Sequence, residues 1–303
     1  MLCPYMLLAG TLPSSLFRLS TLARLYLNSN LISGGISSAV VGLTQIHEIH
    51  LSLNALTGVI SASLGKLTAV TELLLDGNFL TGTIPAVMGN LSECFLLGLS
   101  ENALSGSLPY SLGNLSKLAG LLLSGNGLTG SIPNSIGDLT ALKTLNLFDN
   151  KLSGWLPTSL GSMSQLNFMF LNNNSLDGPI PSSLGNLANI TELVLAENHL
   201  TGPIPSTLAK LRKLTVMIFF DNMLTGEIPS AFGELTRIVL ISLSVNALSS
   251  TIPSSLGNLS KMVVLYVSKN VLTGRDSSNW THSVYFRILA CSWNSRFVSK
   301  LPQ

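Results

Sequence analysis

One asparagine recurs in this 303-residue chain every 24 residues, with no insertion or deletion between copies. The series is Asn30, Asn54, Asn78, Asn102, Asn126, Asn150, Asn174, Asn198, Asn222, Asn246 and Asn270. Apolar residues keep the same phase, at positions −8, −5, −3, +2, +6, +10 and +13 relative to each asparagine. A fixed period of this length predicts one continuous solenoid rather than a chain of separate domains.

Each repeated residue has a physical role in such a coil. The apolar residues at −5 and −3 point to the same side of a short strand, into the interior, and their neighbours point out. The asparagine carries both donors and acceptors, so a stack of asparagines satisfies backbone groups where the chain leaves the strand. Glycine at +4 permits close approach or positive φ, and proline at +7 holds an extended segment. We therefore interpret the asparagine series as structural.

The composition follows from this repeat and excludes several classes of protein. Hydrophobic residues make up 46% of the chain and charged residues 10%, the reverse of a disordered segment. Sixteen basic residues against fourteen acidic ones give a net charge of +2, without the basic field of a nucleic-acid-binding protein. The longest apolar runs, such as 262–267, have the length of a strand and are too short to cross a membrane.

A unit such as residues 142–161, LKTLNLFDNKLSGWLPTSLG, resembles the plant-type leucine-rich repeat LxxLxLxxNxLxGxIPxxLGxL. Departures are few: Ser37 and Ser61 replace the proline, and Ser250 replaces the glycine. The resemblance implies an α/β-type repeat solenoid, a right-handed superhelix with a concave parallel β-sheet. Its convex side should be 3₁₀ or extended, with little regular α-helix.

The repeat divides the chain into three parts. Residues 1–21 fit the back half of a repeat and form a partial, uncapped N-terminal unit. Residues 22–285 form eleven 24-residue repeats, and residues 286–303 form a degenerate terminal coil or an unrelated tail. Plant extracellular arrays usually end in paired-cysteine caps. The three cysteines here do not form such caps, so the resemblance implies a fragment of a longer array.

Function should reside at the variable positions of the concave face, because the framework is common to all such arrays. Positions −6, −4, −2 and −1 are expected to face outward there. Apolar side chains cluster at these positions on four adjacent coils, and one aromatic residue lies further along: Phe148, Phe168, Phe170, Val194, Val216, Ile218 and Phe220, with Tyr266. Outward aromatics do not gather on a soluble surface unless something covers them.

Acidic residues at position −1, namely Asp149, Glu197 and Asp221, border the same region. The pattern predicts a binding face for a peptide or protein that carries hydrophobic and basic groups. The alternative is that these are ordinary sheet-forming residues, covered by neighbours or by a second copy of the chain.

Glycosylation sequons occur at Asn90, Asn114, Asn173, Asn189, Asn258 and Asn279. Together with the plant-type repeat they favour an extracellular or cell-surface setting for the parent protein.

The sequence predicts no catalytic residues, metal ligands or cofactor. The histidines are interpreted as isolated and exposed, although His50 lies within reach of Glu48 or Glu72. Cys94 occupies a core position and is expected to be a buried apolar residue rather than a reactive thiol.

The leading hypothesis is a non-catalytic recognition module that resembles part of the ectodomain of a plant receptor-like kinase or receptor-like protein. Its expected partners are a protein or peptide ligand and a co-receptor, with no nucleic acid and no membrane insertion by this chain. The alternatives are an inhibitor of a cell-wall-degrading enzyme, similar to the polygalacturonase-inhibiting proteins, and an ice-binding solenoid. Regular hydroxyls at position +3, such as Thr81 and Thr129, resemble the surface of an ice-binding solenoid, and their plainer role is to form hydrogen bonds in the turn before glycine.

Overall fold

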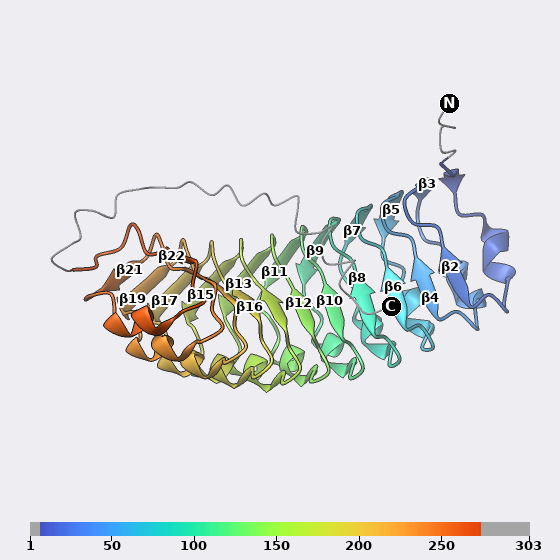
Figure 1. The fold of residues 1–303 in the computed structure, drawn as a ribbon. Coiled ribbons are helices and arrows are strands. Elements are labelled where there is room, and N and C mark those ends of the chain that lie inside the picture. The colour runs from blue at the N-terminus through green and yellow to red at the C-terminus, as the bar shows by residue number, and fades with distance from the viewer. Residues whose placement is uncertain (1–6, 274–303) are drawn as a thin grey trace, which may run out of the picture.

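The computed structural model describes residues 7–273, which form one arched solenoid of stacked coils (Figure 1). Each coil contributes one strand to each of two parallel sheets and one 3₁₀ helix. The fold is the predicted leucine-rich-repeat solenoid, and the described residues contain no regular α-helix.

The first sheet lies on the concave side and carries the variable residues. Its strands cover positions −6 to −4 of each repeat and pair in parallel, always with the strand one repeat away. They are β2 (Arg24–Tyr26), β4 (Glu48–His50), β6 (Glu72–Leu74), β8 (Leu96–Gly98), β10 (Gly120–Leu122), β12 (Thr144–Asn146), β14 (Phe168–Phe170), β16 (Glu192–Val194), β18 (Val216–Ile218), β20 (Leu240–Ser242) and β22 (Val264–Tyr266).

A second parallel sheet follows the asparagine in each coil. The sequence predicted only an extended segment here, because propensity alone does not show that successive segments pair. Its strands are β1 (Ala9–Thr11), β3 (Leu31–Gly34), β5 (Ala55–Val59), β7 (Phe79–Gly82), β9 (Ala103–Ser107), β11 (Gly127–Gly130), β13 (Lys151–Trp155), β15 (Ser175–Pro179), β17 (His199–Pro203), β19 (Met223–Glu227) and β21 (Ala247–Ser249).

The 3₁₀ helices form the remaining side of the coil. They are η1 (Ser14–Arg18), η2 (Ser38–Gly42), η3 (Ala62–Lys66), η4 (Ala86–Asn90), η5 (Tyr110–Asn114), η6 (Asn134–Asp138), η7 (Thr158–Ser162), η8 (Ser182–Asn186), η9 (Ser206–Lys210), η10 (Ser230–Glu234) and η11 (Ser254–Asn258). Proline precedes most of them. The two serines that replace it, Ser37 and Ser61, instead cap η2 and η3 by accepting backbone N–H bonds from Ala39 and Ser63.

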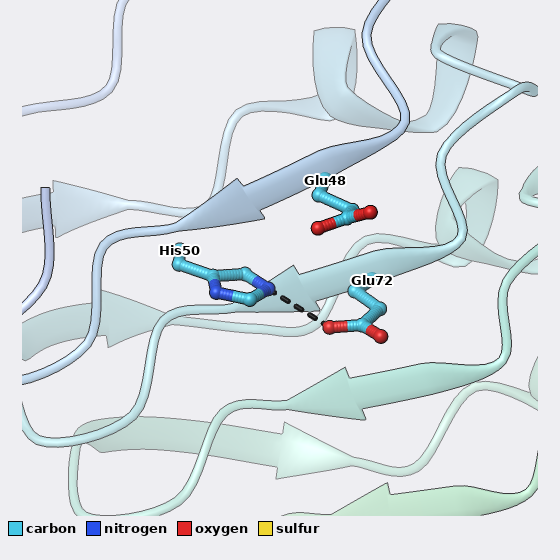
Figure 2. A group of neighbouring side chains, drawn as sticks. All are labelled: Glu48, His50 and Glu72. Carbon is cyan, nitrogen blue, oxygen red and sulfur yellow. Dashed lines mark hydrogen bonds and ion pairs between the residues drawn. The ribbon is translucent and has the colours of Figure 1, made fainter. Parts of the chain in front are cut away.

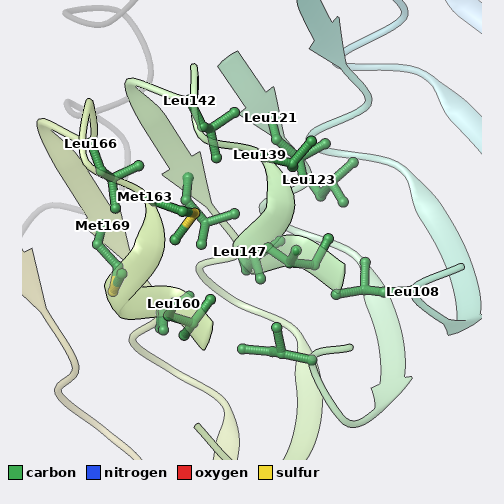
Figure 3. Close-up of a cluster of buried hydrophobic side chains, with 14 of the residues drawn as sticks. Leu108, Leu121, Leu123, Leu139, Leu142, Leu147, Leu160, Met163, Leu166 and Met169 are labelled. Carbon is green, nitrogen blue, oxygen red and sulfur yellow. The ribbon is translucent and has the colours of Figure 1, made fainter. Parts of the chain in front are cut away.

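Leucine-like side chains fill the interior as one continuous core. Figure 3 shows a section of this core with Leu121 of β10, Leu139, which follows η6, and Leu160 of η7. Most of these side chains are completely buried, which confirms the predicted interior positions. Cys94 belongs to the same core.

The asparagines form the predicted structural ladder. The Asn150 side-chain amide donates to the carbonyl oxygens of Leu123 (3.0 Å) and Leu147 (3.2 Å), and its Oδ1 accepts from the backbone N–H of Leu128 (3.1 Å). The same three types of bond recur along the array, so each asparagine ties its coil to the preceding one. A second ladder, which the sequence did not reveal, runs along the 3₁₀ helices, where hydroxyls such as Ser135 donate to a carbonyl one coil earlier.

Two positions in each coil adopt left-handed backbone. The glycines at +4 have φ between 71° and 78° from Gly34 to Gly226, as expected, and Ser250 adopts φ 66° in the same place. Position −1 is also left-handed in every described coil, including Leu53 at 57° and Val245 at 56°. Position −1 was predicted to lie on the sheet. This was wrong, because the strand ends at −4 and the chain is already turning at −1.

Candidate functional site

The predicted apolar residues come together on the concave sheet. Phe170, Val194, Ala196 and Ile218 form a hydrophobic cluster separate from the leucine interior, and Phe148, Phe168, Val216, Phe220 and Leu240 pack against it. We call this set the concave apolar cluster. The Phe168 and Phe170 rings stack with centroids 6.2 Å apart. The cluster spans β12 to β20, so parallel pairing at one repeat per strand builds a continuous surface from residues 24 apart.

The cluster is more tightly packed than the sequence analysis expected of outward-facing residues. Phe170 is 4% exposed, Val194 6% and Ile218 7%. Phe148 and Phe220 lie after the strand, at position −2, and remain half-buried. Tyr266 lies on β22 and is not part of the cluster.

The acidic residues form an exposed margin beside the cluster. Asp149, Glu197 and Asp221 occupy left-handed turns with φ of 54°, 54° and 55°, so the backbone presents their carboxylates at a constant position in each coil. Glu197, His199, Asp221 and Met223 line a hollow together with the ladder asparagines. Partial burial, followed by the charges of Asp221 and Asp149, raises the pKa of Glu197. The margin therefore concentrates negative charge that a basic ligand would neutralise.

Position −2 changes character towards the N-terminus, where it becomes polar. Asp76 Oδ1 accepts the backbone N–H of Ser100 (2.8 Å), and its Oδ2 accepts the Ser52 hydroxyl (3.3 Å). The Ser124 hydroxyl extends this row of hydrogen bonds by one coil, because it donates to the Ser100 hydroxyl (3.1 Å). Burial raises the pKa of Asp76 to about 6, although these hydrogen bonds oppose the shift.

The sequons differ in accessibility. Asn90, Asn114, Asn173 and Asn258 are exposed, whereas Asn189 is half-buried and donates to the Ser164 carbonyl (2.8 Å). Asn279 lies outside the described residues, as do Cys3, Cys291, His282 and the predicted terminal unit 286–303. Within the described range, the exposed sequons are the better candidates for modification.

The cysteine prediction fits the structure. Cys94 is a free, fully buried thiol, and burial raises its pKa to about 12, so it stays protonated and unreactive.

The interpretation of the histidines as isolated was wrong for His50. Its Nε2 lies 2.9 Å from Glu72 Oε2, and Figure 2 shows the ring and this carboxylate facing one another with Glu48 nearby. Glu48 is in turn bonded to Arg24 and Tyr26 of β2. The signal was present in the sequence: residues 48 and 50 share a strand face, and residue 72 lies one repeat from residue 48.

Comparison with known proteins agrees with this architecture. The Leucine Rich Repeat family model matches residues 117–139, 141–163, 165–187 and 189–211. No curated protein matched the chain. Among solved structures, the ectodomain of the Arabidopsis thaliana receptor kinase GASSHO1/SCHENGEN3, in complex with CASPARIAN STRIP INTEGRITY FACTOR 2, is 35% identical with a TM-score of 0.78. That match covers 88% of this chain and 35% of the receptor chain.

Two further structures extend the comparison. The Arabidopsis receptor kinase HAESA, in complex with the peptide hormone IDA and the co-receptor SERK1, is 32% identical (TM-score 0.74), with 87% of this chain and 48% of that chain covered. A plant ice-binding protein is 25% identical (TM-score 0.69), with 82% and 81% covered. The chain thus spans about half or less of the receptor ectodomains that it matches.

The coils, the asparagine ladder and these matches define a leucine-rich-repeat protein. More particularly, it is a plant-type leucine-rich-repeat protein that is structurally similar to the ectodomains of plant receptor kinases. No helix within residues 7–273 has the length and apolar character needed to span a membrane.

Proposed function

We propose that this protein is a non-catalytic recognition module that binds a peptide or protein ligand on its concave face. The observation that carries the proposal is the concave apolar cluster with the acidic margin of Asp149, Glu197 and Asp221 beside it. Apolar anchors bordered by charge are the usual anatomy of a recognition surface. Similar ectodomains have been solved with a peptide hormone and a co-receptor, which supports the same class of partner here.

The chemistry of the face defines the ligand class. The half-buried Phe168 and Phe220, which pack against the buried Phe170 and Ile218, supply apolar contact, and the margin adds negative charge, so the ligand should carry hydrophobic and basic side chains. A protein that binds such a ligand as the similar receptor ectodomains do would be extracellular, and its exposed sequons would be available for glycosylation.

The test uses a library of immobilised peptides that contain hydrophobic and basic residues. Peptides that bind the intact chain should lose most of their affinity for the double variant Phe168→Ser/Phe220→Ser, in which both substituted side chains are half-buried members of the concave apolar cluster. Phe79→Ser is the matched control, because Phe79 is 64% exposed on β7 of the second sheet. Unchanged binding to the double variant, or an equal loss in the control, would contradict the proposal.

A second candidate function is ice binding, because the plant ice-binding protein matches over most of both chains. The second sheet presents exposed hydroxyls in successive coils, including Thr81, Thr129 and Thr201. Some of them are engaged in the fold, since Thr81 donates to the Gly58 carbonyl (3.2 Å), and Trp155, 69% exposed, interrupts the surface. Thermal hysteresis in the purified protein, abolished by Thr81→Lys/Thr129→Lys, would establish this function in place of peptide recognition.

A further inference from the structure

Three side chains that can coordinate metal ions converge at the N-terminal end of the concave sheet. They are Glu48 and His50 of β4 and Glu72 of β6, and one ligand atom from each lies within 4.8 Å of the others. Elsewhere in residues 7–273, no other three His, Cys, Asp or Glu side chains bring ligand atoms this close. The group is several coils away from the concave apolar cluster, so it is not part of that surface.

The backbone fixes this arrangement. Glu48 and His50 are two residues apart on one strand, so both side chains project from the same face. Parallel pairing places Glu72 directly beside Glu48. Strands that are hydrogen-bonded on both sides move little, and a site built on strands is more precise than one built on loops.

We propose that Glu48, His50 and Glu72 bind a divalent transition-metal ion of the Zn²⁺ type. One imidazole and two carboxylates, with room for solvent, match the three-protein-ligand sites in which Zn²⁺ keeps one open position. With Zn²⁺ bonds of about 2.0–2.1 Å, neighbouring ligand atoms in a tetrahedron are about 3.3 Å apart. His50 Nε2 and Glu72 Oε2 are already 2.9 Å apart, so the ion needs only a slight opening of this pair. Glu48 then completes the site by a small shift, in which one carboxylate oxygen binds the ion through a second lone pair and keeps its hydrogen bond to β2.

Side chains of β2 hold Glu48 and His50 in place. Arg24 Nε donates to Glu48 Oε1 at 2.9 Å, and the Tyr26 hydroxyl donates to Glu48 Oε2. These bonds lower the pKa of Glu48, with the Tyr26 bond as the largest contribution, which keeps the carboxylate ionised. The Tyr26 ring also packs on the His50 ring, with centroids 4.6 Å apart. Such outer contacts restrict ligand motion and tune affinity.

The site is open to an ion from solution. The side chains of Glu48, His50 and Glu72 are 20%, 22% and 33% exposed, so each is anchored in the sheet and still reaches solvent. The positive charge of Arg24 is paired with Glu48, with 2.9 Å between Arg24 Nε and Glu48 Oε1.

The experiment is a calorimetric titration of the full chain with ZnCl₂ after removal of metal by a chelator. A parent chain with Cys3→Ser and Cys291→Ser removes two thiols that would bind Zn²⁺ independently of this site. We expect one ion per chain, and we expect His50→Gln and Glu72→Gln each to weaken binding by more than about tenfold. His199→Gln is the matched control and should retain the parent affinity, because His199 is an exposed histidine on the second sheet.

A measurement without substitutions locates the ion independently. Titration with Co²⁺, observed by nuclear magnetic resonance, should broaden the amide signals of β2, β4 and β6 before those of any other strand. Circular dichroism in the presence of chelator confirms that each variant is folded. Absence of Zn²⁺ binding by the parent chain, equal binding by His50→Gln, or Co²⁺ broadening centred elsewhere would overturn the proposal.

Discussion

The asparagine ladder gives the sharpest test of how this fold is held together. In Asn150→Ala the coil loses the acceptor for the buried Leu128 N–H and the donor to the carbonyl oxygens of Leu123 and Leu147. An unsatisfied buried donor costs about 1–3 kcal/mol, and each lost hydrogen bond contributes about 1 kcal/mol. With one donor left unsatisfied and two other hydrogen bonds lost, we expect the free energy of unfolding to fall by about 3–5 kcal/mol.

Two assays check this value. Urea unfolding, followed by circular dichroism, measures the global loss. Amide hydrogen exchange measures the local effect: Leu128 N–H should exchange faster in the variant, whereas Leu104 N–H, which is bonded to Asn126 Oδ1, should change little. The local measurement matters because repeat arrays need not unfold in a single step.

Asn186→Ala is the matched control. Asn186 is an exposed asparagine at the end of η8, outside the ladder, so its removal should change stability by less than about 0.5 kcal/mol. If Asn150→Ala cost no more than Asn186→Ala, the ladder would not carry the stability assigned to it.

Three other predictions follow from backbone and charge. Gly137→Ala should lower the free energy of unfolding by about 1–3 kcal/mol, because its Cβ would lie 2.3 Å from the Ser159 carbonyl oxygen. Gly35→Ala, whose Cβ would meet nothing closer than 3.5 Å, should be tolerated, and urea unfolding of both variants tests the contrast. Val245→Asn should raise the melting temperature and stabilise the fold by about 1 kcal/mol, because valine at φ 56° is strained and asparagine tolerates this conformation. Asp76, with its pKa raised to about 6, favours folding when protonated. The contribution of Asp76 to the free energy of unfolding is complete below the ordinary pKa of an aspartate and is lost as pH rises through about 6. In Asp76→Asn the free energy of unfolding should therefore depend less on pH in this range. An unchanged dependence on pH would contradict the burial argument.

The repeat framework could be predicted from sequence because each of its residues performs the same task in every coil. The leucine phase located the interior, and the asparagine spacing located the ladder. The second sheet could not be predicted in the same way, because its strands include glycine and proline, and pairing depends on the stacking of whole coils.

The candidate site was predicted less completely. Phe170 and Ile218 were assigned to one surface because residues 24 apart occupy adjacent strands, and the structure brings them together. Their close packing and the left-handed backbone at position −1 could not be predicted from the spacing of residues. His50 was interpreted as isolated although Glu72 lay within reach, because strand register shows that two residues are neighbours but not that their side chains bond.

The regular stacking of the concave strands also sets a length scale for any ligand that lies along the array. Neighbouring parallel strands are about 4.8 Å apart. The strands of Phe170 and Ile218 have one strand between them and are therefore separated by about 9.6 Å. A fully extended β-strand presents side chains on one face about every 6.6 Å, out of step with this interval. A polyproline II helix presents them every third residue, about 9.3 Å. The spacing of alternate coils therefore matches the side-chain repeat of a polyproline II ligand and does not match that of an extended β-strand ligand.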